Sequence, residues 1–209
     1  MDVENKPDAR YLAPVPWLLS MLVAALALLV WAQGLGWQFS GLSAEAIFPV
    51  LGILAFSLMW VHYAVDFLER FFSFESWAGY LPVTRYVVLF ALIMHPGLLA
   101  WAAWRGGFGL PPESFLNYVG ADYQIWVIMG IVAWLAFMAF ELHHWYRNRP
   151  WFRWVGYATD AAMIAIFFHA LQLGGDVQTG WFHWVWYFYG ASLVIFLIKA
   201  YVDVYRSRA

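Results

Sequence analysis

The sequence contains no cysteine and few charged residues. The absence of cysteine excludes disulfide frameworks, thiolate metal sites and cysteine nucleophiles. Only 11% of the 209 residues are charged, and 11 Lys and Arg against 13 Asp and Glu leave no basic surface for nucleic acid. Because 64% of the residues are hydrophobic and the mean hydropathy is +0.65, the composition predicts an integral membrane protein in a lipid bilayer.

Long charge-free runs separate the few charged residues. A charge at the bilayer centre costs about 2.5–3.5 kcal/mol on insertion scales, so these runs mark the membrane spans. The runs lack the alternation of a membrane β-barrel, and each has about the 20 residues that a ~30 Å hydrocarbon core requires. The predicted fold class is therefore all-α, a polytopic bundle of six transmembrane helices at 17–33, 46–68, 83–104, 123–146, 154–173 and 181–205.

Basic residues are distributed unequally between the two sides of this predicted bundle. The side that holds both termini carries ten of the eleven Lys and Arg residues, and the other side carries only Arg105. This asymmetry predicts a short cytoplasmic N-terminus (1–16), a transmembrane domain over 17–205 and a cytoplasmic tail (206–209). The expected location is the cell inner (cytoplasmic) membrane, with several passes.

Two histidines lie at matching depth in two of the spans. His95 is about 12 residues from the cytoplasmic end of the third predicted helix and His169 about 15 from that of the fifth, which places both roughly 18–22 Å from that boundary. Two imidazoles at one level on two bundle helices suit bis-histidine ligation of a haem iron. Pro96 and Gly97 favour a kink and the close approach of a flat ligand. The alternative is that each histidine only hydrogen-bonds a neighbouring helix.

A second polar group lies nearer the cytoplasmic side. His62 and Asp66 are four residues apart on the second predicted helix, and Glu141 and His144 are three apart on the fourth, beside His143. Each pair therefore shares one helix face, and Glu-x-x-His is half of the pattern of a carboxylate-bridged di-iron site. Three interpretations stand: a non-haem metal site, a second haem that includes His62, and a solvated polar rim paired with nearby arginines.

Several short motifs together resemble one known family, the bacterial ferric-reductase-like transmembrane proteins, which are six-helix relatives of the NADPH-oxidase membrane domain. The similarity covers roughly residues 50–205 and preserves the order of the motifs. They are MHPGLLA at 94–100, GLPP at 109–112, YVG at 118–120, YRNR at 146–149, WFRW at 151–154 and HALQLGGD at 169–176.

This resemblance implies a specific set of haem ligands. In the family, two haems stack between the third and fifth helices, and each helix supplies two histidines. His95 and His169 correspond to the outer pair. The inner pair would lie about 13–14 residues away along each helix. Those positions here hold Leu81 or Pro82 and Val155 or Gly156, so the resemblance implies one haem b, near the outer face.

A weaker analogy keeps a second haem open. The ascorbate-reducible two-haem cytochromes b, another six-helix group, pair histidines on the second and fourth helices and on the third and fifth. In this sequence His62 would pair with His143 or His144, and His95 with His169.

Two functional hypotheses follow from the sequence. The first is a membrane b-type haem protein that transfers electrons, as ferric reductases do, from a quinol or a partner redox subunit to an acceptor outside. The second is a haem-free structural or accessory subunit of a larger membrane complex, which the short termini and the missing inner ligands favour. Neither hypothesis assigns a catalytic residue.

Overall fold

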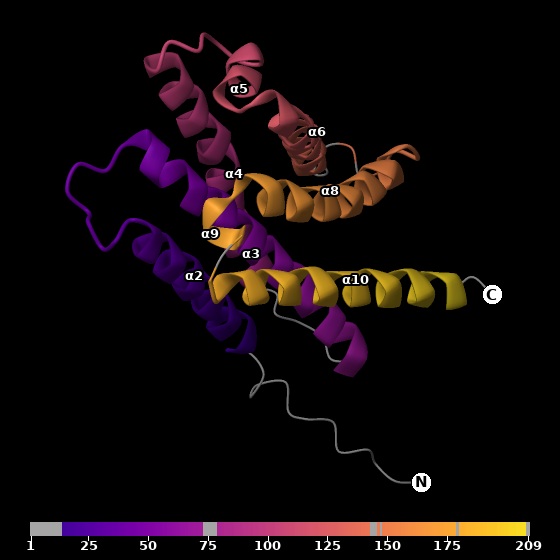
Figure 1. Ribbon diagram of the computed structural model, residues 1–209. Helices are drawn as coiled ribbons and strands as arrows, with labels where there is room; N and C mark the ends of the chain where they lie inside the picture. The colour runs from indigo at the N-terminus through magenta and orange to yellow at the C-terminus, as the bar shows by residue number, and fades with distance from the viewer. Residues whose placement is uncertain (1–13, 73–78, 143–145, 147, 179, 208–209) are drawn as a thin grey trace, which may run out of the picture.

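The computed structural model describes residues 14–72, 79–142, 146, 148–178 and 180–207 (Figure 1). Six helices in this part are long and apolar enough to cross a membrane. They are α2 (Val15–Gly34), α3 (Ala44–Phe72), α4 (Tyr80–Arg105), α6 (Gln124–Glu141), α8 (Phe152–Leu173) and α10 (Phe182–Arg206). The described residues form no β-strand. The prediction of an all-α, multi-pass membrane protein is therefore confirmed.

Short helical segments interrupt two connections for which the sequence predicted only loops. α5 (Glu113–Tyr118) and the 3-10 turn η1 (Ala121–Tyr123) lie between α4 and α6, and α9 (Gly175–Gln178) lies between α8 and α10. Pro112 directly precedes α5. Proline suits a helix start, because the first turn needs no N–H from it. These segments matter below because they form one end of the candidate site.

The fourth span ends earlier than the sequence predicts. The apolar pattern suggests a helix to residue 146, but α6 ends at Glu141. Arg85 of α4 donates through Nε to the Glu141 carboxylate at 2.8 Å and through its guanidinium to the Glu141 main-chain carbonyl at 3.4 Å. A cation at a helix C-terminus satisfies carbonyls that have no intrahelical donor. A residue 56 positions away in the chain thus caps the end of α6.

The helices pack mainly as two pairs. α3 packs along α4, and α6 packs along α8, whereas direct contact between the two pairs is mostly that of α3 with α8. α2 lies against α3, and α10 crosses α3 (Figure 1). The arrangement leaves the two pairs facing each other, with α5 and α9 at one end.

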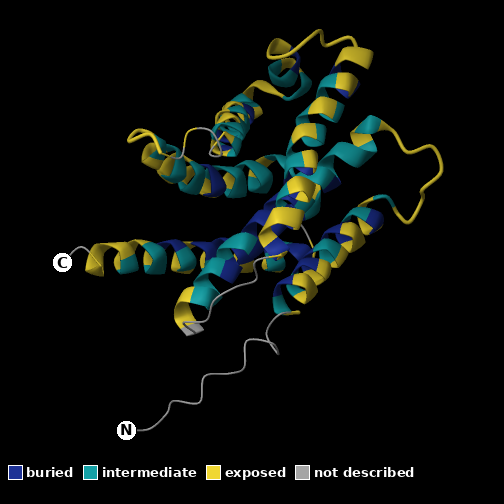
Figure 2. Ribbon diagram, turned by 180° about the vertical axis from the view of Figure 1, so that it is seen from behind, coloured by how far each residue is buried: buried dark blue, intermediate teal, exposed yellow. Residues whose placement is uncertain are grey.

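Buried residues concentrate on α3 near its crossing with α10 (Figure 2). In an apolar 18-residue stretch of α3, half of the residues are buried, which is the largest share among the six spans that the structure describes. Aromatic rings fill this crossing: the ring centroids of Phe56 and Trp186 are 4.4 Å apart, and those of Trp60 and Tyr189 are 4.7 Å apart. α3 is therefore the central helix, and many apolar side chains of the other spans face outward, as a surface in contact with lipid requires.

Candidate functional site

A cavity of about 760 Å³ lies between the two helix pairs. Residues of α3, α4, α6 and α8 form its walls, and α5 and α9 form one end. The lining is mostly apolar, with a few polar side chains: His95, Tyr118, Trp134, His169, Asp176 and Trp186. A volume of this size and an apolar wall with a few placed polar groups are typical of small-molecule and cofactor sites, which measure roughly 300–1,000 Å³.

His95 and His169 line this cavity from different helix pairs. Nδ1 of His95 donates to the main-chain carbonyl of Phe48 on α3 at 2.7 Å, and Nδ1 of His169 donates to that of Trp126 on α6 at 2.8 Å. A carbonyl only accepts, so each Nδ1 carries a hydrogen. A charged ring is costly in an apolar cavity, and a neutral ring with its hydrogen on Nδ1 keeps the lone pair on Nε2. In the part of the chain that the structure describes, neither Nε2 has a hydrogen-bond partner. Nε2 of each ring is thus available to ligate a metal ion.

Each imidazole also lies against a glycine of the helix that it hydrogen-bonds. A methyl group on Gly52 would lie 2.9 Å from Cε1 and Nδ1 of His95, and a methyl group on Gly130 would lie 2.6 Å from the same atoms of His169. Real Cβ atoms essentially never approach that closely. Both ring positions therefore require glycine on the neighbouring helix as they stand. This donor set fits a bis-imidazole metal group: two neutral rings, fixed in tautomer and orientation, in one apolar cavity.

Pro96 affects the wall of the cavity as well as the shape of α4. Proline has no N–H, so it leaves the carbonyl of Leu92, four residues earlier, without its helical donor. Trp134 of α6 replaces that donor, because its Nε1 donates to the Leu92 carbonyl at 2.9 Å. Trp134 lines the cavity, so this bond joins α6 to α4 at the cavity wall.

Two ionisable side chains, Tyr118 and Asp176, lie where α5 and α9 close the cavity. Burial raises the pKa of Asp176 above its ordinary value of 3.8. Burial, and then the negative charge of Glu45, raise the pKa of Tyr118. Gly34, at the end of α2, leaves room for the Asp176 carboxyl, since a methyl group there would lie 2.5 Å from Oδ1. This end of the site therefore favours neutral over anionic groups.

His62, one of the histidines predicted for the second polar group, hydrogen-bonds Thr84 rather than a carboxylate. Thr84 Oγ1 donates to the main-chain carbonyl of Tyr80 at 3.0 Å, so its oxygen is left to accept from His62 Nε2 at 2.8 Å. The Tyr80 hydroxyl in turn lies 2.6 Å from Ser20 Oγ of α2. His62 thus belongs to a polar chain between α2, α3 and α4 and does not line the cavity.

The carboxylates of that group pair with arginines. Asp66 accepts from Arg70 at 2.8 Å, and Glu141 accepts from Arg85. His143 and His144 lie outside the described residues. Within the described ranges, no group of three or more His, Asp or Glu side chains is placed to hold a metal ion. The described members of the group therefore match the polar-rim interpretation better than a di-iron site.

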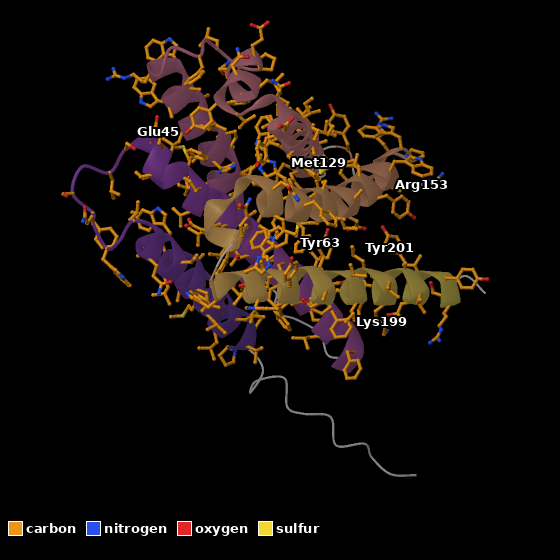
Figure 3. All side chains as sticks on the ribbon, in the orientation of Figure 1. Glu45, Tyr63, Met129, Arg153, Lys199 and Tyr201 are labelled. Atoms are coloured by element: carbon orange, nitrogen blue, oxygen red, sulfur yellow. The ribbon has the colours of Figure 1, made fainter. Side chains whose placement is uncertain are left out.

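Asp160 makes an arrangement that sequence reasoning did not identify. Tyr63 of α3 donates to Asp160 Oδ1 at 2.7 Å, and Tyr201 of α10 donates to Oδ2 at 2.6 Å. Both tyrosines point into the space between α8 and α10 (Figure 3). Two phenols thus satisfy one carboxyl of α8 and link three helices, as a polar side chain within a membrane span requires.

The residues that hold the two imidazoles were also missed, although a signal for them exists. Residues 48–56 (FPVLGILAF) and 126–134 (WVIMGIVAW) are similar over nine positions, with an aromatic residue four before and four after a glycine. A self-comparison of the sequence at this length would have singled out Gly52 and Gly130.

No protein-family model, curated protein or solved structure matches this chain. The resemblance to ferric-reductase-like proteins stays a prediction, and the function has to be argued from the geometry of the site.

Proposed function

We propose that this protein is a membrane b-type haem protein that transfers electrons, in which His95 and His169 would ligate the iron of one haem. The observation that carries the proposal is that two imidazoles from different helix pairs line one apolar cavity, each with its Nε2 free of hydrogen bonds from the described residues. When bound, such a haem supplies one-electron redox chemistry.

The main-chain carbonyls of Phe48 and Trp126 would tune the ligands. A histidine that ligates a metal almost always donates its other ring N–H to a carbonyl, a carboxylate or water, which fixes the tautomer and makes the ligating nitrogen more basic. The bonds from His95 and His169 have this form and this direction. Neither bond needs to form on binding, so the rings are arranged beforehand.

The apolar lining would exclude water and lower the local dielectric. Among the described residues that line the cavity there is no lysine or arginine, and the one carboxylic acid, Asp176, has a raised pKa. A cavity of this kind disfavours net charge. It would therefore stabilise the oxidation state of the haem that carries the smaller net charge. The reduction potential of the haem would shift in the direction that favours that state.

The electron donor in this proposal is a quinol of the bilayer or a partner redox subunit, and the acceptor lies outside. Leu81, Pro82, Val155 and Gly156 occupy the places of the family's inner ligands, and none has a side chain that ligates iron. The chain thus lacks the inner pair through which that family passes electrons across the whole membrane. A donor that reaches the cavity through the bilayer or through a partner removes the need for such a pair.

A reduced-minus-oxidised absorption spectrum of the detergent-purified protein, produced with ample haem, tests the proposal. We expect a Soret and α-band change in the wild type and its loss in His95→Ala and in His169→Ala. His183→Ala is the matched control, because Nδ1 of His183 also donates to a main-chain carbonyl, that of Val177 at 2.9 Å, but the residue lies outside the cavity lining. This variant should keep the wild-type spectrum.

Two results would refute the haem proposal. One is wild-type protein without a chromophore under these conditions. The other is a spectrum that survives both His95→Ala and His169→Ala. A colourless chain that co-purifies with a stoichiometric membrane partner would support the alternative, a structural or accessory subunit of a larger complex.

A further inference from the structure

The two helix pairs present the same local arrangement twice. The similar segments 48–56 and 126–134 lie on α3 and α6. The histidine-bearing helices are similar as well, with ALIMH at 91–95 on α4 and AIFFH at 165–169 on α8. In each pair the first helix carries the accepting carbonyl and, four residues later, the glycine, and the second helix carries the imidazole.

We propose that Gly52 and Gly130 are positioning residues that set the planes of the His95 and His169 rings and so would keep both imidazoles on the iron of the proposed haem. The inference rests on the proposed haem function and extends it. It assigns a role to two glycines that line the cavity and that act on the bound group through the histidines.

Each ring is held on two sides. The carbonyl of Phe48 and the α-carbon of Gly52 are one helical turn apart, so they lie on the same face of α3. The His95 ring hydrogen-bonds the first and lies against the second. Trp126 and Gly130 hold the His169 ring in the same way on α6. A methyl group at either glycine must therefore turn the ring away from its carbonyl or push the two helices apart.

Glycines of the two histidine-bearing helices, α4 and α8, show that this crowding is specific. A methyl group on Gly97, two residues after His95, or on Gly156 of α8 would meet no atom within 4 Å. In a helix interior glycine is less favourable than alanine. Positions 97 and 156 have room for a methyl group, so packing does not require glycine there. At positions 52 and 130, in contrast, the imidazole occupies the space that any side chain would need.

The test compares Gly52→Ala, Gly130→Ala and the double variant with Gly156→Ala as the matched control. The measurements are the spin state of the haem, the affinity of the apoprotein for haem and the binding of carbon monoxide after reduction. We expect the wild type and Gly156→Ala to be low-spin and closed to carbon monoxide. The alanine variants at 52 and 130 should show a high-spin fraction, bind carbon monoxide and lose about 10–100-fold in haem affinity, the range typical of changes behind a metal ligand.

A second comparison does not depend on whether these variants fold with a displaced ring. His169→Gly removes the tethered imidazole, and free imidazole in the buffer should then restore low-spin haem. In Gly130→Ala/His169→Gly, the methyl group occupies the place of the ring, so restoration should require at least about tenfold more imidazole.

The outcomes separate this inference from the proposed function. If the wild type carries no haem, the proposed function fails. If the wild type is low-spin while Gly52→Ala and Gly130→Ala match Gly156→Ala in spin state and affinity, the positioning role alone is overturned. Equal rescue of His169→Gly and Gly130→Ala/His169→Gly by imidazole would overturn it as well.

Discussion

The indole of Trp134 donates to the main-chain carbonyl of Leu92, the carbonyl that Pro96 leaves without a helical donor. A residue of α6 thereby completes the hydrogen bonding of α4 across the wall of the cavity. This bond joins two helix pairs whose described residues meet mainly through α3 and α8. We expect it to hold α4 and α6 at a fixed separation.

Trp134→Phe should destabilise the protein by about 1–2 kcal/mol, because it leaves the Leu92 carbonyl without a donor in an apolar environment. In the Pro96→Ala background the same change should cost less, since the alanine main chain then supplies the missing N–H. Thermal unfolding of both single variants and the double variant in detergent measures this coupling and removes the shared packing loss. Strictly additive effects would show that the bond contributes nothing.

The two phenols that bind Asp160 should differ in their contributions to stability. Tyr63→Phe removes a hydrogen bond to a carboxyl from a half-buried side chain, and we expect a loss of about 1.5–2 kcal/mol. Tyr201 is 41% exposed, so its bond competes with solvent or lipid headgroups and Tyr201→Phe should cost below about 1 kcal/mol. Unfolding in a mixed-micelle titration gives both values. A larger cost for Tyr201→Phe would contradict this account.

Asp176 should make stability depend on pH in a defined direction. Burial raises its pKa, so the folded protein binds this proton more tightly than the unfolded chain does. The stabilising contribution is complete below the unfolded pKa of about 3.8 and is lost as the pH rises through the raised pKa. Asp176→Asn, which stays neutral, should therefore be more stable than the wild type at neutral pH, and the gap should narrow toward pH 4. Unfolding midpoints over a pH series test this, and a gap that does not change with pH would count against it.

Gly190 offers a test of packing away from the two imidazoles. A methyl group there would collide with the Phe167 ring, where α10 meets α8. Gly190→Ala should thus destabilise the fold by about 1–3 kcal/mol. Gly156→Ala, which meets nothing, should be neutral or slightly stabilising. Comparable unfolding midpoints for the two variants would show that the α8–α10 contact is loose.

The spans could be predicted from the sequence because each depends on a local property. A run without charges must be helical in a bilayer, and the first predicted span, 17–33, lies within α2 (Val15–Gly34) for that reason. The end of α6 was predicted too late, and Arg85, which caps it, is remote in the sequence. Local patterns do not contain such contacts.

The candidate site was predicted in part. The depths of His95 and His169 follow from helical rise, and the structure places both in one cavity. The carbonyls of Phe48 and Trp126 could not be predicted, because every residue has a carbonyl and only packing decides which one meets a ring. Pro96 leaves the Leu92 carbonyl without a helical donor, whereas the donor that replaces it, Trp134, depends on how α6 lies against α4.

The most direct test of the central claim is a haem titration of purified apoprotein, followed by electron paramagnetic resonance of the oxidised product. We predict saturation at one haem per chain and a low-spin ferric signal of bis-imidazole type, both of which require His95 and His169. Failure to saturate, or a five-coordinate high-spin signal from the wild type, would contradict the assignment of these two histidines as a pair of axial ligands.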